Sequence, residues 1–413
     1  MPSYKSIVQQ AGSDLAQQKE TFFEGTFTQE ALINSSIETV RNFDDDISRL
    51  KKDAHILFKS PDAQKNAGND LAQLFDKWRD NPPSTTALIC FAAEHFDIPA
   101  DDKNLKAAIM AGIAAEVDNN NPYHSNHHFR EVTATMARLC NTNNELAAGG
   151  QAGGILLDTG NIAKCLLAAA GHDLMHDGKT NSLQGPESHE QYRLENKAIE
   201  AIEPFMKLTG MSSRDQEDVR VMIRITDISA KPGQPSPHKH LKEITALSAQ
   251  TFVTPPELLS GPVAETRISM PPDVAAGKIQ SSFISLPPDA GKSPVETTIT
   301  LPGELADLAR NKQLLVMSTL MSDADLGPST ATNFEYSRKM TTLLSHENPA
   351  LADSNKTLDG FLTFVVGGKL TSDAGQKASG NTLATIMQEA KKPDNGGPNP
   401  AGPKAQSGKP QPQ

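Results

Sequence analysis

Apolar residues in the first 80 positions recur at the spacing of an α-helix. The segment LAQLFDKWRD places four apolar residues on one helix face, Leu71, Leu74, Phe75 and Trp78. The proline-containing sequence NPPS at residues 81–84 then interrupts the pattern. We therefore predict an N-terminal helical region over residues 1–82.

A second helical stretch begins at residue 83 and continues, with interruptions, to about residue 228. Its first helix has an apolar face that includes Phe91. His95 continues this face one turn later, which predicts a core or boundary histidine rather than a metal ligand. No stretch alternates apolar and polar residues for long enough to predict a sheet. Because a helical pattern returns after residue 303, the region 83–370 is predicted to form an all-α, multi-helix bundle.

Residues 229–305 break the helical pattern and contain a quasi-repeat. Four proline-bearing phrases recur at spacings of 15 or 16 residues: VTPPE at 253, ISMPPD at 268, ISLPPD at 284 and ITLPGE at 299. Such short, proline-rich units predict an insertion of extended or hairpin segments, with a flexible low-complexity loop as the alternative. Residues 371–413, rich in Lys, Gly, Pro, Asn and Gln, are predicted to form a disordered tail.

The composition narrows the classes of function. The 413 residues carry a formal net charge of -11, which disfavours general attraction to nucleic-acid polymers. The first residues lack the apolar core of a secretory signal, and no run is long enough to span a membrane. Three widely spaced cysteines, Cys90, Cys140 and Cys165, are predicted to be reduced and mostly buried. Together these features predict a cytoplasmic protein.

Five of the eleven histidines lie between residues 124 and 176, in two short segments. In YHSNHH, His124 and His128 are four residues apart, and in GHDLMH the same spacing separates His172 and His176, so each pair would share a helix face. The apolar segment before GHDLMH predicts a buried helix that delivers His172 and Asp173 to the interior. Burying so many ionisable groups is costly unless they pair or bind a cation, and imidazole with carboxylate suits zinc, manganese or iron.

Two other interpretations of these segments stay open at this point. HDLMH differs by one methylene from HExxH, the zinc-peptidase helix whose glutamate is the general base. That interpretation leaves the histidine pair at residues 124 and 128 without a role. The other is a polar helix interface that binds no metal.

Four phrases together resemble the signature of class I cyclic-nucleotide phosphodiesterases, within the wider HD-domain metal phosphohydrolases. The family's tyrosine–histidine–asparagine motif with its second histidine is similar to residues 123–132, and HDxxHPGxxN is met at residues 172–181 with Asp177 in the proline position. The family phrase LEN is matched at residues 194–196, and ADLS followed by proline is matched at residues 324–328. All four occur in the family's order.

The resemblance implies roles for individual residues. Four of them would hold a first metal, zinc in most of the family: His128, His172, Asp173 and Asp325. Asp173 would also bridge to a second metal, magnesium or manganese, and a hydroxide between the metals would attack the phosphate of a 3',5'-cyclic nucleotide to give the 5'-monophosphate. His124 would protonate the leaving alkoxide. His176 and Glu195 would hold metal-bound water or orient His124.

Some positions depart from the family pattern or leave it open. Asp323 competes with Asp325 because a helix cannot aim residues two apart at one site, and only the family phrase favours Asp325. Ser125 stands where the family has asparagine, and Phe129 where it has a small residue. His127 falls at a variable position of the motif and is predicted to be incidental.

The nucleobase pocket departs most. The family reads its purine with a glutamine two residues before a Gly-Phe pair whose phenylalanine stacks on the base. Here Gly360 and Phe361 match the pair, but Leu358 occupies the glutamine position. Tyr123 and Phe361 are candidate substrate-binding residues, with a plain core role as the alternative for Phe361.

The leading prediction is therefore a metal-dependent phosphodiesterase for a cyclic nucleotide. One alternative is an HD-type phosphohydrolase for a different phosphodiester or nucleotide. The other is a degenerate, non-catalytic binding module.

Overall fold

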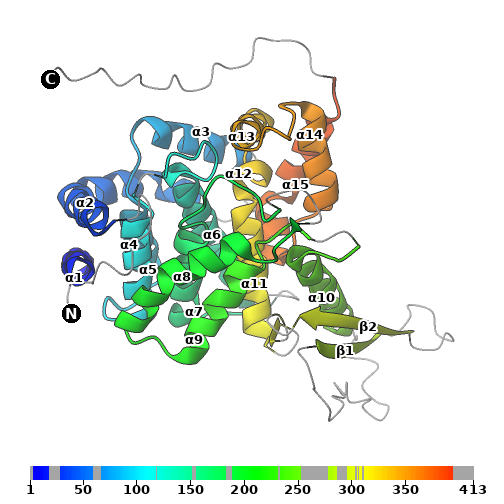
Figure 1. Ribbon diagram of the computed structural model, residues 1–413, viewed down its shortest axis with the longest axis horizontal. Helices are drawn as coiled ribbons and strands as arrows, with labels where there is room; N and C mark the ends of the chain where they lie inside the picture. Colours follow the sequence, from blue (N-terminus) through cyan, green and yellow to red (C-terminus); the bar gives the residue numbers. More distant parts are fainter. Residues whose placement is uncertain are drawn as a thin grey trace.

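The computed structural model shows a largely helical protein (Figure 1). It describes residues 3–17, 28–58, 67–117, 119–150, 155–182, 188–230, 233–252, 278–285, 295–302, 305, 307–308 and 311–393. The all-α class predicted from the sequence is confirmed for these residues, apart from one β-hairpin in the predicted insertion. Among the described helices, none is long and apolar enough to cross a membrane.

The helices follow one another along the chain with short connections. Before the site-bearing helices come α1 (Tyr4–Ala16), α2 (Gln29–Leu57), α3 (Ala67–Asp80), α4 (Thr85–His95) and α5 (Lys103–Ala114). The middle of the chain forms α6 (Asn126–Ala148), α7 (Thr159–Gly171), α8 (Arg193–Leu208), α9 (Ser213–Arg224) and α10 (Pro237–Phe252). The last part forms α11 (Lys312–Asp325), α12 (Gly327–Thr330), α13 (Phe334–Glu347), α14 (Asn355–Gly360), a π-helix (Phe361–Val365) and α15 (Asp373–Ala390).

The insertion contains a two-stranded antiparallel hairpin. Strands β1 (Lys278–Ser285) and β2 (Val295–Pro302) pair in register, with Lys278 opposite Pro302 and Ser285 opposite Val295. The hairpin contacts α10 (Figure 1). The phrase ISLPPD begins in the last two residues of β1, and ITLP forms the end of β2. The hairpin interpretation is thus confirmed for these strands, whereas the first two proline phrases lie outside the described residues.

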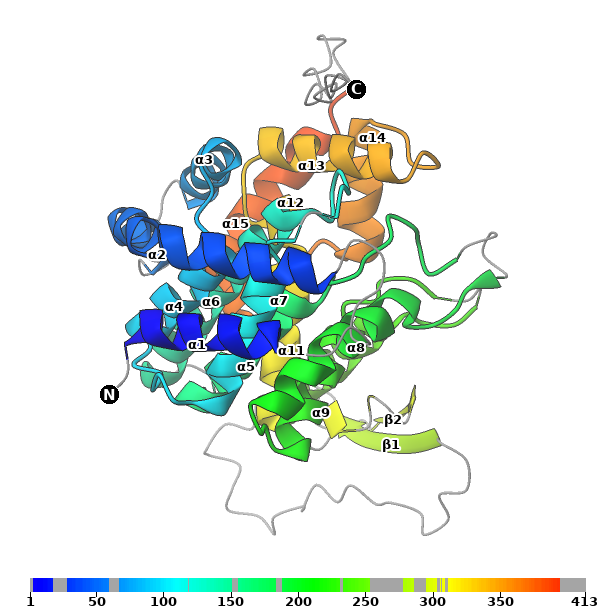
Figure 2. The ribbon, with the colours of Figure 1, turned by 60° about the vertical axis from the view of Figure 1, so that its left-hand side comes forward.

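One hydrophobic core joins the N-terminal helices to the rest of the molecule. It includes Val8 and Leu32 from α1 and α2, Trp78 from α3, and residues as far along the chain as Ala378. α1 lies beside α2 (Figure 2), and both pack on α5. The predicted boundary after residue 82 therefore falls within a shared core.

His95 is a surface residue, so the predicted core or boundary position is wrong. Its ring stacks on Phe58 at a centroid distance of 3.7 Å, and its Nε2 lies 2.9 Å from Asn141 Oδ1. The apolar face that predicted its position turns toward solvent by the last turn of α4, where Glu94 is also exposed.

The tail predicted to be disordered from residue 371 is wrong over its first twenty residues. There α15 forms an 18-residue helix that buries Ala374, Ala378, Leu383 and Ile386. Its small residues hid this face from the sequence, because Gly, Ser and Ala carry little hydrophobic signal although they permit close packing. Close approach is visible at Gly375, where an added Cβ would lie 2.4 Å from Asp323 Oδ2.

Helices α6, α7 and α11 pack against one another at the centre of the molecule (Figure 1). Every residue of α7 from 161 to 171 is buried, as the apolar segment before GHDLMH predicted. The start of α6 and the ends of α7 and α11 lie close together, and these helix ends carry the candidate functional residues.

Candidate metal centre

Two histidines and two aspartates converge where α6, α7 and α11 meet. His172 Nε2 lies 3.0 Å from Asp173 Oδ2 and 3.2 Å from Asp325 Oδ1. His128 Nε2 lies 3.4 Å from the same oxygen of Asp173 and 3.5 Å from that of Asp325. We call His128, His172, Asp173 and Asp325 the His/Asp cluster. The structure brings together all four residues that the sequence predicted as ligands.

Helix ends position these side chains. His128 lies in the first turn of α6, His172 directly follows the last residue of α7, and Asp325 is the last residue of α11. His172 Nδ1 lies 3.0 Å from the carbonyl oxygen of Ala169. Since a carbonyl can only accept, Nδ1 carries the hydrogen, and in neutral imidazole Nε2 keeps its lone pair toward the carboxylates.

The electrostatics of the His/Asp cluster favour a bound cation. Burial lowers the pKa of His128, but the nearby carboxylates of Asp173 and Asp325 outweigh this effect and raise that pKa to about 9. Burial likewise opposes the carboxylate of Asp325, yet the two histidines hold its pKa at about 2. With neutral imidazoles, the half-buried carboxylates of Asp173 and Asp325 carry two negative charges, which a divalent cation would balance.

The donor atoms also fit a transition metal. The Nε2 atoms of His128 and His172 are buried and have no hydrogen-bond partner among the described residues. One ligand atom from each of the four residues lies within 4.8 Å of all the others. Imidazole nitrogen and carboxylate oxygen are ligands that zinc, manganese and iron accept. The cluster can therefore hold a divalent transition metal.

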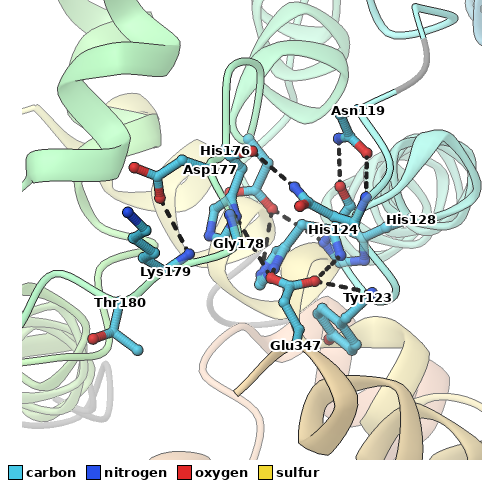
Figure 3. Close-up of polar contacts among 12 residues, drawn as sticks. Asn119, Tyr123, His124, His128, His176, Asp177, Gly178, Lys179, Thr180 and Glu347 are labelled. Carbon is cyan, nitrogen blue, oxygen red and sulfur yellow. Dashed lines mark hydrogen bonds and ion pairs between the residues drawn. The ribbon is translucent and has the colours of Figure 1, made fainter. Parts of the chain in front are cut away.

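A second cluster adjoins the first and contains a residue that the sequence did not indicate, Glu347 at the end of α13 (Figure 3). Its Oε1 pairs with His124 Nδ1, and its Oε2 accepts the backbone N–H groups of Tyr123 and His124 at 3.0 and 3.1 Å. Burial opposes the Glu347 carboxylate, but His124 holds its pKa at about 2. No sequence motif indicates Glu347, because it lies more than 220 residues after its partner His124.

His176 completes this second cluster by stacking on His124. The two rings lie 3.7 Å apart with an interplanar angle of 24°. His176 Nδ1 accepts the backbone N–H of Gly178 at 3.1 Å, and burial together with His124 lowers the His176 pKa to about 3, so the ring is neutral. Nearly parallel rings cannot aim their lone pairs at one ion, so this arrangement suits proton handling better than metal binding.

His124 links the two clusters. While Nδ1 faces Glu347, its Nε2 lies 3.9 Å from Asp173 Oδ2. A histidine held by a carboxylate at one nitrogen presents the other in a fixed orientation. That second nitrogen faces the His/Asp cluster.

Glu195 lies in α8 and accepts a hydrogen bond from Asn181 Nδ2 at 3.0 Å. Burial raises its pKa to about 8, and the nearby carboxylate of Asp227 adds to the effect. Asp227, which the sequence did not single out, accepts the backbone N–H of Tyr192 at 3.2 Å. The two carboxylates form an acidic pair, and the hydrogen bond to Asn181 ties Glu195 to the HDLMHDGKTN segment.

Asp323 and Asp325 have different surroundings. Asp323 accepts the backbone N–H groups of Thr371 and Ser372 at 2.8 Å each, together with the Ser372 hydroxyl at 2.6 Å. It therefore fixes the segment that starts α15, while Asp325 faces the two histidines.

His127, predicted to be incidental, belongs to a buried network of its own. Its Nε2 lies 2.9 Å from Glu131 Oε1, which also accepts the Tyr336 hydroxyl. Arg79 of α3 donates to Tyr336 at 3.1 Å and lies 3.5 Å from Glu131. We call Arg79, His127, Glu131 and Tyr336 the Glu131 network. It shares no residue with the His/Asp cluster.

The candidate substrate-binding residues differ in their environments. Tyr123 packs near His128 at a ring distance of 5.0 Å, and burial, then Asp325, raises its pKa. Phe361 begins the π-helix and packs against a small apolar cluster that includes Leu326, the neighbour of Asp325. Leu358, in the family's glutamine position, is 1% exposed and belongs to that same apolar cluster.

Comparison with known proteins gives similarity in structure only. No protein-family profile matches the sequence, and no curated protein sequence matches it. Among solved structures, the phosphodiesterase domain of the RhoPDE fusion protein from the choanoflagellate Salpingoeca rosetta is 16% identical, with a TM-score of 0.43 over 81% of this chain and 93% of that one. LmjPDEB1 in complex with IBMX is also 16% identical, with a TM-score of 0.46 over 82% of this chain and 96% of that one.

Proposed function

We propose that this protein is a metal-dependent phosphodiesterase that hydrolyses a 3',5'-cyclic nucleotide to the 5'-monophosphate. The observation that carries the proposal is the His/Asp cluster, whose two buried Nε2 atoms face two carboxylates. A histidine paired with a buried glutamate stands beside it. In this pair of His124 and Glu347, the imidazole provides a proton donor next to the His/Asp cluster.

His128, His172, Asp173 and Asp325 would hold the first cation, proposed to be zinc, and Asp173 would be shared with a second, magnesium or manganese. When bound, such cations make water a stronger acid and neutralise the charge of a phosphate. The acidic pair Glu195 and Asp227 would order water beside the second cation.

His124 is the proposed general acid. Its Nδ1 pairs with Glu347, which fixes the ring, and its Nε2 faces the His/Asp cluster. A proton on Nε2 can therefore pass to the 3'-oxygen as the phosphorus–oxygen bond breaks. His176, stacked and neutral, keeps the His124 ring in this orientation.

Two residues are proposed to contact the substrate. Tyr123 packs near His128, and Phe361 begins the π-helix. The burial of Leu358 favours a second candidate function. Since no amide stands in that position, hydrolysis of a different phosphodiester is the alternative. We also propose a reducing, cytoplasmic compartment, supported by three buried cysteines that form no disulfide.

The acid role can be tested by varying the leaving group. His124→Asn should lower turnover of a cyclic nucleotide about 10²–10⁴-fold. It should have little effect on bis(p-nitrophenyl) phosphate, whose phenolate leaves without protonation. Bound metal, measured by mass spectrometry, should stay at the wild-type level. Equal losses on both substrates would contradict the acid role.

A panel of cyclic mononucleotides, cyclic dinucleotides and simple phosphodiesters tests the substrate class. Turnover of cyclic mononucleotides by the metal-loaded protein supports the leading proposal. Turnover of only another phosphodiester supports the alternative, and bound metal without any turnover contradicts both.

A further inference from the structure

Lys242 in α10 holds the end of the π-helix that carries Phe361. Its ammonium donates to the carbonyl oxygen of Val366 and, at 3.0 Å, to that of Lys369. Between these carbonyls the chain turns through Gly367 and Gly368, both left-handed with φ of 65° and 69°. Carbonyl groups at a helix end carry partial negative charge, so a cation there is stabilising.

The contact reaches Phe361 through the backbone. Val366 N–H donates to the Phe361 carbonyl at 3.1 Å, the i to i−5 bond of the π-turn. Gly368 N–H donates to the Leu362 carbonyl at 2.9 Å. A π-turn is rare and occurs frequently at functional sites. Lys242, from another helix, donates to the backbone directly after this turn.

The same face of α10 also contacts α11, the helix that ends at Asp325 of the His/Asp cluster. His238, four residues before Lys242, has Nδ1 2.9 Å from the Ser322 hydroxyl of α11. Ser322 lies one turn before Asp325, and both His238 and Ser322 are buried. Residues four apart share a helix face, so one face of α10 contacts both the end of the π-helix and α11.

Burial distinguishes Lys242 from an ordinary surface lysine. Burial lowers its pKa, while the carboxylate of Asp323 opposes that effect. By contrast, Lys239 in the same helix is exposed. The half-buried Lys242 ammonium, which donates to two carbonyls, therefore has a structural role beside the π-helix.

We propose that Lys242 is a positioning residue that fixes the Phe361 segment relative to Asp325 and thereby sets the affinity for substrate. The proposal rests on the proposed function, with Phe361 as a substrate contact.

The kinetic test compares three variants of the full chain. Lys242→Met keeps the length of the side chain but cannot donate to the carbonyls. It should raise KM about tenfold, the size expected when hydrogen bonds from a charged group are lost, with kcat and metal content unchanged. Lys242→Arg should restore most of the affinity, and Lys239→Met should behave as wild type. An unchanged KM in Lys242→Met, or a fall in kcat with loss of metal, would overturn the proposal.

Hydrogen exchange provides a readout that needs no substrate. In Lys242→Met, amides of residues 362–368 should exchange about tenfold faster, while those of α11 keep their protection. Unchanged protection at residues 362–368 would overturn the proposal even where wild type is active. Conversely, a wild type that hydrolyses no phosphodiester refutes the proposed function, and the exchange result then decides by itself whether Lys242 holds the segment.

Discussion

Two buried clusters start from adjacent residues of α6 and are built in opposite ways. The Glu131 network starts at His127 and contains its own permanent cation, because the Arg79 guanidinium lies 3.5 Å from the Glu131 carboxylate. The His/Asp cluster starts at His128 and has two carboxylates but no Lys or Arg partner within its set. One network balances its charge from within the chain, and the other needs protons or a metal to do so.

The two clusters differ in how the charge beside each histidine is balanced. Both His127 and His128 are buried, so burial alone does not distinguish them. What distinguishes them is the partner of the ring nitrogen that faces the carboxylates. His127 Nε2 lies 2.9 Å from one carboxylate that a guanidinium already neutralises, whereas His128 Nε2 lies between two carboxylates that have no Lys or Arg partner among the described residues.

The largest effect is expected from breaking the His/Asp cluster. Asp173→Ala should remove bound metal and lower kcat by about 10³-fold or more, since metal ions supply several kcal/mol of transition-state stabilisation. Asp323→Asn is the matched control, because it changes a buried aspartate two residues from Asp325 that faces α15 instead. Mass spectrometry of bound metal and steady-state kinetics test both variants. A metal-replete, active Asp173→Ala protein would contradict the assignment.

Breaking the Glu131 network should affect stability instead of metal binding. Arg79→Met leaves the Glu131 carboxylate buried without its cation and should lower the free energy of unfolding by about 3–5 kcal/mol. Lys339→Met, which removes an exposed cation 5.6 Å from the Tyr336 ring centroid, should cost about 1 kcal/mol or less. Urea denaturation measures both. Loss of metal from folded Arg79→Met would show that the two clusters are coupled.

The Glu131 network should also contribute a pH-dependent term. Burial opposes the Glu131 carboxylate, yet His127 and Arg79 lower its pKa from 4.5 to about 2. A depressed pKa adds stability that is complete above pH 4.5 and is lost as the pH falls toward 2, by about 3 kcal/mol in total. The difference in unfolding free energy between wild type and Glu131→Gln should therefore shrink between pH 6 and pH 3. A difference that stays constant over this range would contradict the shift.

The smallest effect is expected from adding metal, which should stabilise only proteins whose His/Asp cluster is intact. Zinc at 100 times its dissociation constant should stabilise the wild type by about 2.7 kcal/mol. Arg79→Met should keep this increment, because its cluster takes no ion, and Asp325→Ala should lose it. Denaturation with zinc and with chelator provides the measurement, and equal increments in the two variants would refute the separation.

The histidine pairs could be predicted from the sequence because their spacing of four residues is local. So could the helical class, since apolar positions recur at helical spacing over most of the chain. Glu347 could not, because it approaches His124 only through tertiary packing and stands in an ordinary polar segment. The choice between Asp323 and Asp325 was equally invisible to periodicity, since α11 is buried nearly all round. The helix α15 escaped because its buried face consists largely of small residues.

The contact between Asp323 and Ser372 determines when α11 can reach its final packing during synthesis of the chain. Asp323 lies in the helix that ends at the last member of the His/Asp cluster, and its hydrogen-bond donors come from Thr371 and Ser372. During synthesis, all four members of the cluster are added to the chain before these donors. Until then the Asp323 carboxylate has neither of the backbone amides that later bind it. The nascent protein can thus assemble the cluster's residues early, but α11 acquires its final support only when translation has passed residue 372.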